Sequence, residues 1–137
     1  MNAAGSSRIN IARLLIGLVL FLNLQAALIF ILNPGSYTGG FEISGVGGEK
    51  IVQGMGILFL MWNVPYAFAL IHPLRHRTSL IQAVIMQAIG VIGETALRLT
   101  LPPGHLALEQ TAERFILFDA AGLMALLAAA WITRPHR

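Results

Sequence analysis

Four long apolar stretches constrain the fold of this chain more than any other feature of its sequence. They run over about residues 9–32, 51–71, 80–100 and 115–132, and polar or helix-breaking residues separate them. A helix needs roughly 20 mostly apolar residues to cross the hydrocarbon core of a bilayer. Inside that core the backbone must satisfy its own hydrogen bonds, which a helix does. The sequence therefore predicts four transmembrane helices.

The composition agrees with a membrane protein and excludes several other classes. Hydrophobic residues make up 56% of the chain and charged residues only 11%, whereas soluble domains carry about 25% charged residues. The absence of cysteine excludes disulfides, thiolate metal sites and thiol redox chemistry. The nine cationic residues are spread along the chain and form no nucleic-acid patch, so we expect no nucleic-acid partner. At 137 residues, the chain is expected to be a single four-span transmembrane domain over 1–137.

The segments between the apolar stretches contain clear helix-ending signals. Asn33, Pro34 and Gly35 follow the first stretch, and "LPPGH" at 101–105 follows the third. The first stretch is longer than the apolar region of a typical signal peptide, and no A-x-A-like cleavage site follows promptly. We therefore expect the first stretch to be a retained helix rather than a cleaved signal.

The distribution of cationic residues predicts an orientation. An even number of spans places both termini on one side of the membrane, and six of the nine cations fall on that side. By the positive-inside rule, the termini and the loop between the second and third spans are cytoplasmic, in the cytoplasmic (inner) membrane. The six are Arg8, Arg13, Arg75, Arg77, Arg134 and Arg137, and the other three are Lys50, Arg98 and Arg114.

Small and polar residues recur at helical spacing and predict which face of each helix points inward. In the third span this stripe consists of Ala83, Gln87, Gly90, Glu94 and Arg98. Membrane helices associate through such small and polar residues. One inward stripe per helix predicts an all-α fold, a membrane-embedded antiparallel four-helix bundle. The fourth span repeats the pattern at Asp119, Gly122, Ala125 and Ala129.

Pro65 lies within the second span and removes a backbone hydrogen bond, so a kinked second helix is expected. Two interpretations of the kink remain open. In one, Asn63 or a packed neighbour satisfies the freed carbonyl; in the other, the kink opens a small cavity in the bundle.

Ionisable residues in the later spans predict a polar layer near the outer face. Glu94 lies about 21 Å along its helix from the cytoplasmic start, and Asp119 about 6 Å inside the outer end of the fourth span. In a core about 30 Å thick, the two carboxylates would lie at similar heights on adjacent helices. The expected layer, which is the candidate binding site, consists of Glu94, Arg98, Asp119, Gln53 and Arg114.

Three interpretations of this layer are open. Glu94 and Arg98 have the favourable i, i+4 order for an ion pair, and a structural pair that fixes bundle packing is the expectation. A binding or transport site is the first alternative, because charges inside a membrane are costly and are functional candidates by default. Acid–base catalysis by the two carboxylates is the second alternative.

Cofactor, metal and nucleophile patterns are missing from the sequence, so we predict no cofactor, no metal and no catalytic residue. The four histidines, His72, His76, His105 and His136, all fall at membrane boundaries, which excludes a haem held inside the bundle. "GVGGEK" at 45–50 does not meet the phosphate-loop pattern G-x-x-x-x-G-K-[ST].

The segment "GEKIVQGMGILFLMWNVPYAFALIHPLRHR" at 48–77 resembles the second-helix region of small four-helix membrane proteins related to the DoxX family. In particular it looks like the DoxX-like domain-of-unknown-function group, in which a glycine-containing second helix follows a short extracytoplasmic loop. The resemblance implies a four-span fold over most of the chain. It implies no single activity, since some members are linked to oxidoreductase complexes, and it assigns no functional residue here.

The sequence thus predicts a multi-pass membrane protein without its own catalysis. We expect an accessory or binding subunit that acts alone, as a homo-oligomer or inside a larger membrane complex, with the lipid bilayer as its surroundings. The alternative is a small transporter or a lipid- or quinone-binding protein that uses the polar layer.

Overall fold

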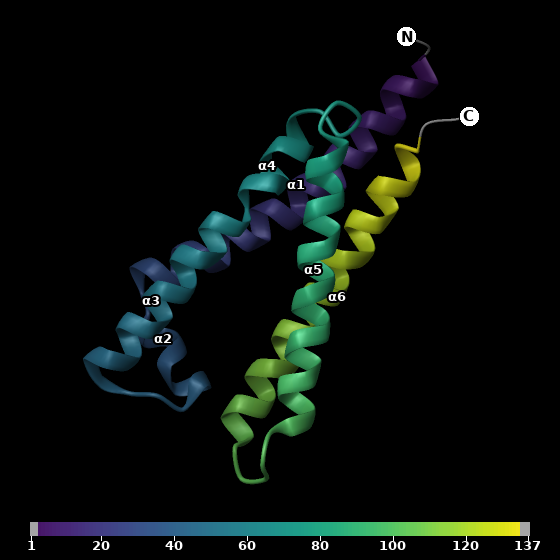
Figure 1. Cartoon of the computed structure of the whole chain (residues 1–137). Helices are drawn as coiled ribbons and strands as arrows, with labels where there is room; N and C mark the ends of the chain where they lie inside the picture. The colour runs from purple at the N-terminus through teal and green to yellow at the C-terminus, as the bar shows by residue number, and fades with distance from the viewer. Residues whose placement is uncertain (1–2, 135–137) are drawn as a thin grey trace.

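The computed structural model describes residues 3–134, and side chains from residue 6 onward. All regular structure in this range is helical (Figure 1). His136 and Arg137, which entered the charge and histidine arguments, lie outside the described residues. The long helices are α1 (Ala3–Leu32), α3 (Gly45–Trp62), α4 (Val64–Ile71), α5 (Arg77–Thr100) and α6 (Leu106–Ile132), and the short ones are α2 (Gly35–Thr38) and the 3₁₀ turn η1 (Gly39–Phe41).

Four helical segments of the described chain are long and apolar enough to cross a membrane, which fits a multi-pass membrane protein. They are Ser6–Leu32, Gly45–Ile71, Arg77–Thr100 and Leu106–Ile132. The helices extend beyond the predicted apolar stretches, most of all α6, which begins at Leu106 rather than near residue 115. Charged residues such as Glu109 and Glu113 end an apolar stretch, but they are good helix formers and do not end the helix.

The helix break at Pro65 is present. Helix α3 ends at Trp62 and α4 begins at Val64. The Asn63 amide donates to the Leu60 carbonyl (3.3 Å), and the Asn63 side-chain Nδ2 donates to the Phe59 carbonyl (2.6 Å). The Asn63 side chain thus satisfies the Phe59 carbonyl at the break, whereas the carbonyl that Pro65 leaves without a backbone donor is that of Met61, four residues earlier. The choice between the two interpretations of the kink therefore stays open.

The hydrophobic core lies toward the end of the molecule that carries the start of α1 and the end of α6, here called the terminal end (Figure 1). Helix α1 packs against α3, α4 and α6, and α5 packs against α4 and α6. The core is built from four helices, and its buried members are Ala12, Ile16, Val19 and Leu20 of α1, Tyr66 and Ala69 of α4, Leu80 and Ala83 of α5, and Leu126 and Ala129 of α6.

Two arginines fasten helices together at the terminal end. Arg13 of α1 donates from Nε to the Leu70 carbonyl (3.0 Å), in the last turn of α4. Arg77 at the start of α5 donates from Nη1 to the Thr133 carbonyl (3.1 Å), just after α6. The carbonyls at a helix C-terminus have no partner within the helix and carry partial negative charge, so cationic donors stabilise them.

The opposite end of the molecule, here called the loop end, carries the segments 33–44 and 101–105. The α1–α3 pair and the α5–α6 hairpin run at an angle to each other and diverge toward this end (Figure 1). Helix α3 and helix α5 share at most slight backbone contact. The turn η1 bridges the space, because the Thr111 hydroxyl of α6 donates to the Gly40 carbonyl (2.8 Å).

Glu42 and His105 connect the two loop-end segments. Their side chains are 2.6 Å apart (Glu42 Oε2 to His105 Nδ1). This hydrogen bond is the main reason that the pKa of Glu42 lies below its ordinary value of 4.5, and the backbone amides of Leu108 and Ala107 favour the charged carboxylate as well. Glu42 therefore supplies negative charge to the first turn of α6, where the helix has unpaired amides.

Candidate functional site

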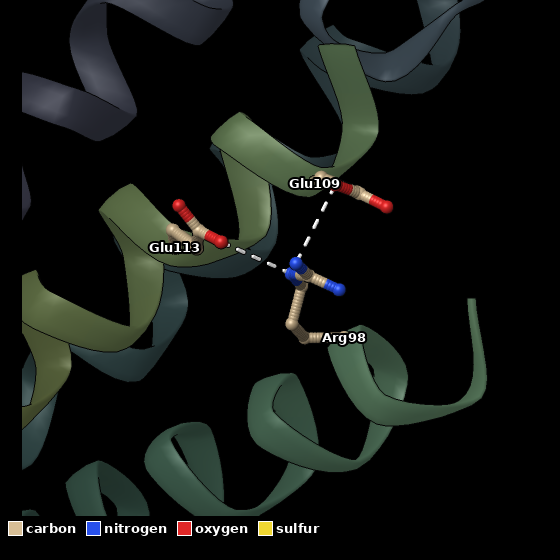
Figure 2. Close-up of polar contacts among 3 residues, drawn as sticks. All are labelled: Arg98, Glu109 and Glu113. Atoms are coloured by element: carbon tan, nitrogen blue, oxygen red, sulfur yellow. Dashed lines mark hydrogen bonds and ion pairs between the residues drawn. The ribbon is translucent and has the colours of Figure 1, made fainter. Parts of the chain in front are cut away.

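Arg98 does not pair with Glu94, which corrects the expected structural pair. Its guanidinium reaches from α5 to α6 (Figure 2), where Nη2 lies 3.4 Å from Glu109 Oε2 and Nε lies 3.2 Å from Glu113 Oε1. Glu109 and Glu113 are one turn apart on the facing helix, so one guanidinium contacts two carboxylates. An i, i+4 pairing with Glu94 would satisfy only one.

Glu94 is consequently left without a partner in the described part of the chain. It is half-buried on α5, and its Oε2 is enclosed by protein without a hydrogen bond. An enclosed carboxylate oxygen without a donor is costly, and such atoms in folded proteins call for a specific explanation. A bound ligand that donates a hydrogen bond or carries positive charge is one such explanation.

Asp119 belongs to a buried hydrogen-bonded chain that crosses three helices. The Tyr66 hydroxyl of α4 donates to Gln87 Oε1 (2.6 Å), and Gln87 Nε2 of α5 donates to Asp119 Oδ1 of α6 (2.8 Å). Tyr66 and Gln87 are only 3% and 4% exposed, so their polar groups need protein partners; the Tyr66 hydroxyl also lies 3.3 Å from the Ala83 carbonyl oxygen. The chain fixes the Asp119 carboxylate in place.

Two glycines leave space for the side chains of Gln87 and Asp119 in this hydrogen-bonded series. A Cβ at Gly90 would collide with Asp119 Oδ2, and a Cβ at Gly122 would lie 2.7 Å from Gln87 Nε2. The Asp119 carboxylate therefore rests on the bare backbone of α5 at Gly90. Since Glu94 stands one turn further along the same face of α5, the two carboxylates are neighbours, and they interact electrostatically.

A cavity of about 350 Å³ lies beside Glu94 at the loop end. Helices α3, α5 and α6 and the turn η1 line it, and its walls are almost entirely apolar. Glu94 and Arg98 are its only charged lining residues within the described chain. Leu97, which also lines it, is 69% exposed, so the cavity reaches the surface of the molecule at this residue of α5.

Aromatic rings form one wall of this cavity. Phe41 of η1, Phe59 of α3 and Phe115 of α6 line it, and the buried Phe30 of α1 packs behind them. Their ring centroids are 5.4–6.5 Å apart in tilted, stacked and edge-on contacts. Mutual packing of this kind holds aromatic rings rigidly, so the wall has a defined shape.

The remaining two residues of the expected polar layer lie elsewhere. Gln53 donates to the Ile31 carbonyl (3.1 Å) and accepts from Lys50 Nζ (2.7 Å), which places it on the α1–α3 side. Arg114 is exposed on α6 and does not line the cavity. The structure therefore brings Glu94, Asp119 and Arg98 to one region but not Gln53 or Arg114.

Sequence reasoning did not include Tyr66, Gln87 or the phenylalanines in the site. Gln87 stood on the inward stripe of the third span, and its position beside Gly90 was the available signal. The aromatic wall had no such signal, because Phe41, Phe59 and Phe115 come from three segments whose spatial proximity only the fold reveals.

Among residues 3–134 no cluster of three or more histidine or acidic side chains is arranged to hold a metal ion. No family model matches the chain, and comparisons with curated proteins and with solved structures find no match. The site is therefore interpreted from its own geometry and chemistry.

Proposed function

We propose that this protein is a non-catalytic membrane protein that binds an amphiphilic molecule in the cavity between α3, α5 and α6. The observation that carries the proposal is the unpartnered Glu94 carboxylate on the lining of an apolar cavity. Apolar walls with a small number of polar groups are the usual composition of a small-molecule site. This favours a binding role over a purely structural polar layer.

The size of the cavity and its side opening suit a ligand that comes from the bilayer. Its volume of about 350 Å³ lies within the roughly 300–1,000 Å³ typical of ligand sites. We take its opening to lie at the exposed Leu97 side chain of α5, which would face lipid in a membrane. An apolar molecule with a small polar head enters by that route without crossing water.

The proposal includes an orientation of the bundle in the cytoplasmic membrane. In an antiparallel four-span arrangement with cytoplasmic termini, the loop end and the cavity occupy the outer leaflet. Because the chain lacks cysteine, single-cysteine variants test this directly. In intact cells a membrane-impermeant maleimide should label Ser44→Cys, and it should label Leu74→Cys only after permeabilisation; the reverse result would overturn the orientation.

The protein is further proposed to act as an accessory or binding subunit, alone, as a homo-oligomer or inside a larger membrane complex. The DoxX-like resemblance supports the four-span fold in this proposal and no activity. Purification in mild detergent followed by mass measurement tests the subunit role. A lone monomer without a co-purifying protein would contradict the homo-oligomer and the larger complex and leave only a protein that acts alone.

Ligand binding itself is tested by filling the cavity. Ala112 of α6 lines it, whereas Ala96 of α5 is exposed and lies outside it. We expect Ala112→Leu to weaken saturable binding of a fluorinated benzyl probe to the protein in lipid nanodiscs, measured by ¹⁹F NMR. Ala96→Leu is the matched control and should bind as the unaltered protein does.

Two probes of nearly the same shape serve this test, 4-fluorobenzyltrimethylammonium and its uncharged carbon analogue, 4-fluoroneopentylbenzene. Saturable binding of either probe that Ala112→Leu weakens supports the proposed function. Absence of saturable binding for both, or equal binding by the two alanine variants, would overturn it.

A further inference from the structure

We infer that the ligand of this cavity is an organic cation, and that its binding displaces a proton from the Glu94–Asp119 carboxyl pair. The inference rests on the proposed function and adds to it the chemical class of the ligand and an exchange with protons. The observation that carries it is one cavity whose lining combines the unpartnered Glu94 carboxylate with a wall of aromatic rings. Asp119 lies next to Glu94, against Gly90 of α5, and the one cation on the cavity lining among the described residues, Arg98, is held by Glu109 and Glu113.

The charges around the cavity favour a cationic ligand. Arg98 is the cation nearest Glu94 along α5, and it is bound by Glu109 and Glu113. Two carboxylates therefore already surround the one guanidinium, and Glu94 and Asp119 add two more acidic groups. In an apolar environment an uncompensated negative site attracts positive charge strongly.

The aromatic wall favours a cation for an independent reason. Phe41, Phe59 and Phe115 line the same cavity as Glu94. The face of an aromatic ring attracts a cation within about 6 Å of its centroid, and the attraction grows when the cation is desolvated. A carboxylate and phenyl rings around one cavity suit a quaternary or protonated amine.

The same geometry explains why a proton must leave. Asp119 Oδ1 accepts one hydrogen bond from Gln87, Glu94 Oε2 has none in the described chain, and no basic side chain contacts either carboxylate. Two adjacent bare negative charges inside a membrane are strongly unfavourable. A proton on the pair removes one charge when the cavity is empty, and an arriving cation takes over that role.

The exchange is balanced in atoms and charge. The O–H bond of one carboxylic acid breaks, the proton passes to water or buffer, and the carboxylate forms an ion pair with the cation. The net charge of the site stays the same, since one positive charge leaves as another arrives. No electron transfer and no covalent bond to the ligand is involved.

Other titratable groups near the pair do not supply the missing charge. Helix α4 presents the Tyr66 hydroxyl, which donates toward Gln87; helix α6 presents Glu109 and Glu113, both held by Arg98 of α5. Helix α3 and the turn η1 present only uncharged side chains to the cavity, Met55, Phe59 and Phe41.

The two matched probes test the ligand class on the full chain in lipid nanodiscs. We expect the trimethylammonium probe to bind about tenfold or more tightly than its uncharged analogue, the factor expected when a charged contact is gained. Equal or tighter binding of the uncharged probe would overturn the inference while leaving the proposed function intact. Failure of both probes to bind would remove the proposed function itself.

Proton exchange is tested separately in weakly buffered solution. Binding of the ammonium probe should acidify the medium, and its affinity should rise with pH, whereas the uncharged probe should do neither. Glu94→Gln should abolish the acidification and reduce cation affinity about tenfold or more. Glu49→Gln, which alters an exposed carboxylate on α3, is the matched control and should change neither.

Binding of the ammonium probe to the unaltered protein without proton release would overturn the exchange, and this measurement does not depend on any variant folding. Full retention of cation affinity in a folded Glu94→Gln protein, with folding judged by the unchanged melting of its helices, would overturn the role of Glu94.

Discussion

Glu94 and Arg98 lie one turn apart on α5 but do not pair with each other. Arg98 pairs with two glutamates of α6, whereas Glu94 has no partner among the described residues. The arginine side chain is long enough to reach α6, where two carboxylates are available to it. These contacts are partly exposed, with Arg98 side-chain exposure at 32%, so each contributes only up to about 1 kcal/mol. Their consequence for Glu94 is larger, because they leave a half-buried carboxylate to be neutralised by something other than this protein's own basic residues.

The buried hydrogen bonds from Tyr66 through Gln87 to Asp119 make Gln87 costly to replace. Gln87→Leu keeps a similar volume but removes one acceptor and one donor, so both the Tyr66 hydroxyl and Asp119 Oδ1 lose a partner. We expect a loss of about 1–2 kcal/mol in unfolding free energy, measured by denaturant titration in mixed micelles. Gln82→Leu, at an exposed position of the same helix, should change stability little; equal losses would contradict the buried chain.

Gly90 and Gly93 offer a comparison that isolates the Asp119 carboxylate. A methyl group at Gly90 would collide with Asp119 Oδ2, while a methyl group at Gly93 meets nothing within 4 Å. Alanine is a better helix former than glycine by about 0.5–1 kcal/mol. Gly93→Ala should therefore raise the melting temperature slightly, whereas Gly90→Ala should lower it and weaken probe binding. A Gly90→Ala protein as stable as Gly93→Ala would show that Asp119 does not occupy this place.

At the scale of elements, the contact between α1 and α3 depends on Gly56. A Cβ there would lie 2.9 Å from the Ala27 carbonyl oxygen and 2.8 Å from both Phe30 Cβ and Ile31 Cγ1. Because the backbone of α1 cannot give way as a flexible side chain can, Gly56→Ala should separate the helices and shift the aromatic wall that Phe30 supports. We expect a destabilisation of about 1–3 kcal/mol; Gly54→Ala, which meets nothing within 4 Å, is the control. Denaturant titration of both variants checks this, and equal stability would contradict the close approach.

The four long apolar helical segments, the break at Pro65 and the inward position of Glu94 follow from the sequence because each rests on local chemistry. Apolar length specifies a membrane-crossing helix, and proline removes a specific hydrogen bond. The choice of partner for Arg98 does not follow, because it depends on which turn of α6 faces α5. The i, i+4 rule describes an isolated helix, and here two carboxylates of a facing helix outcompete one carboxylate of the same helix. The start of α6 at Leu106 could not be predicted from apolar length either, since Glu109 and Glu113 shorten the apolar stretch without ending the helix.

At the scale of the whole molecule, the two ends differ in packing: one holds the hydrophobic core and the other holds the cavity. The terminal end holds the core and is fastened by Arg13 and Arg77, whereas the loop end holds the cavity and is bridged by η1 and by the Glu42–His105 contact. Because the core and the cavity lie at different ends, the proposed ligand would bind between the helices of the loop end without disturbing the core. The loop-end contacts then decide how closely the α1–α3 pair and the α5–α6 hairpin approach.

The Glu42–His105 contact predicts a specific pH dependence of stability. The pKa of Glu42 is lowered in the folded protein from its ordinary value of 4.5, so its contribution is fully present above pH 4.5 and is lost as the pH falls through the lowered value. Glu42→Gln removes the ionisable group and should lower the melting temperature at neutral pH. The difference between the two proteins should then shrink as the pH is taken below 4.5.

Melting of the unaltered protein and of Glu42→Gln in nanodiscs, followed by circular dichroism across this pH range, measures the difference. Glu49→Gln controls for the loss of one exposed carboxylate near the same end and should melt close to the unaltered protein at neutral pH. A difference for Glu42→Gln that persists unchanged at the most acidic pH would mean that the charge of Glu42 does not hold the loop-end segments together. Because Glu42 also faces the first amides of α6, protection of the Ala107 and Leu108 amides from hydrogen exchange should fall in Glu42→Gln at neutral pH, which locates the effect at the loop end.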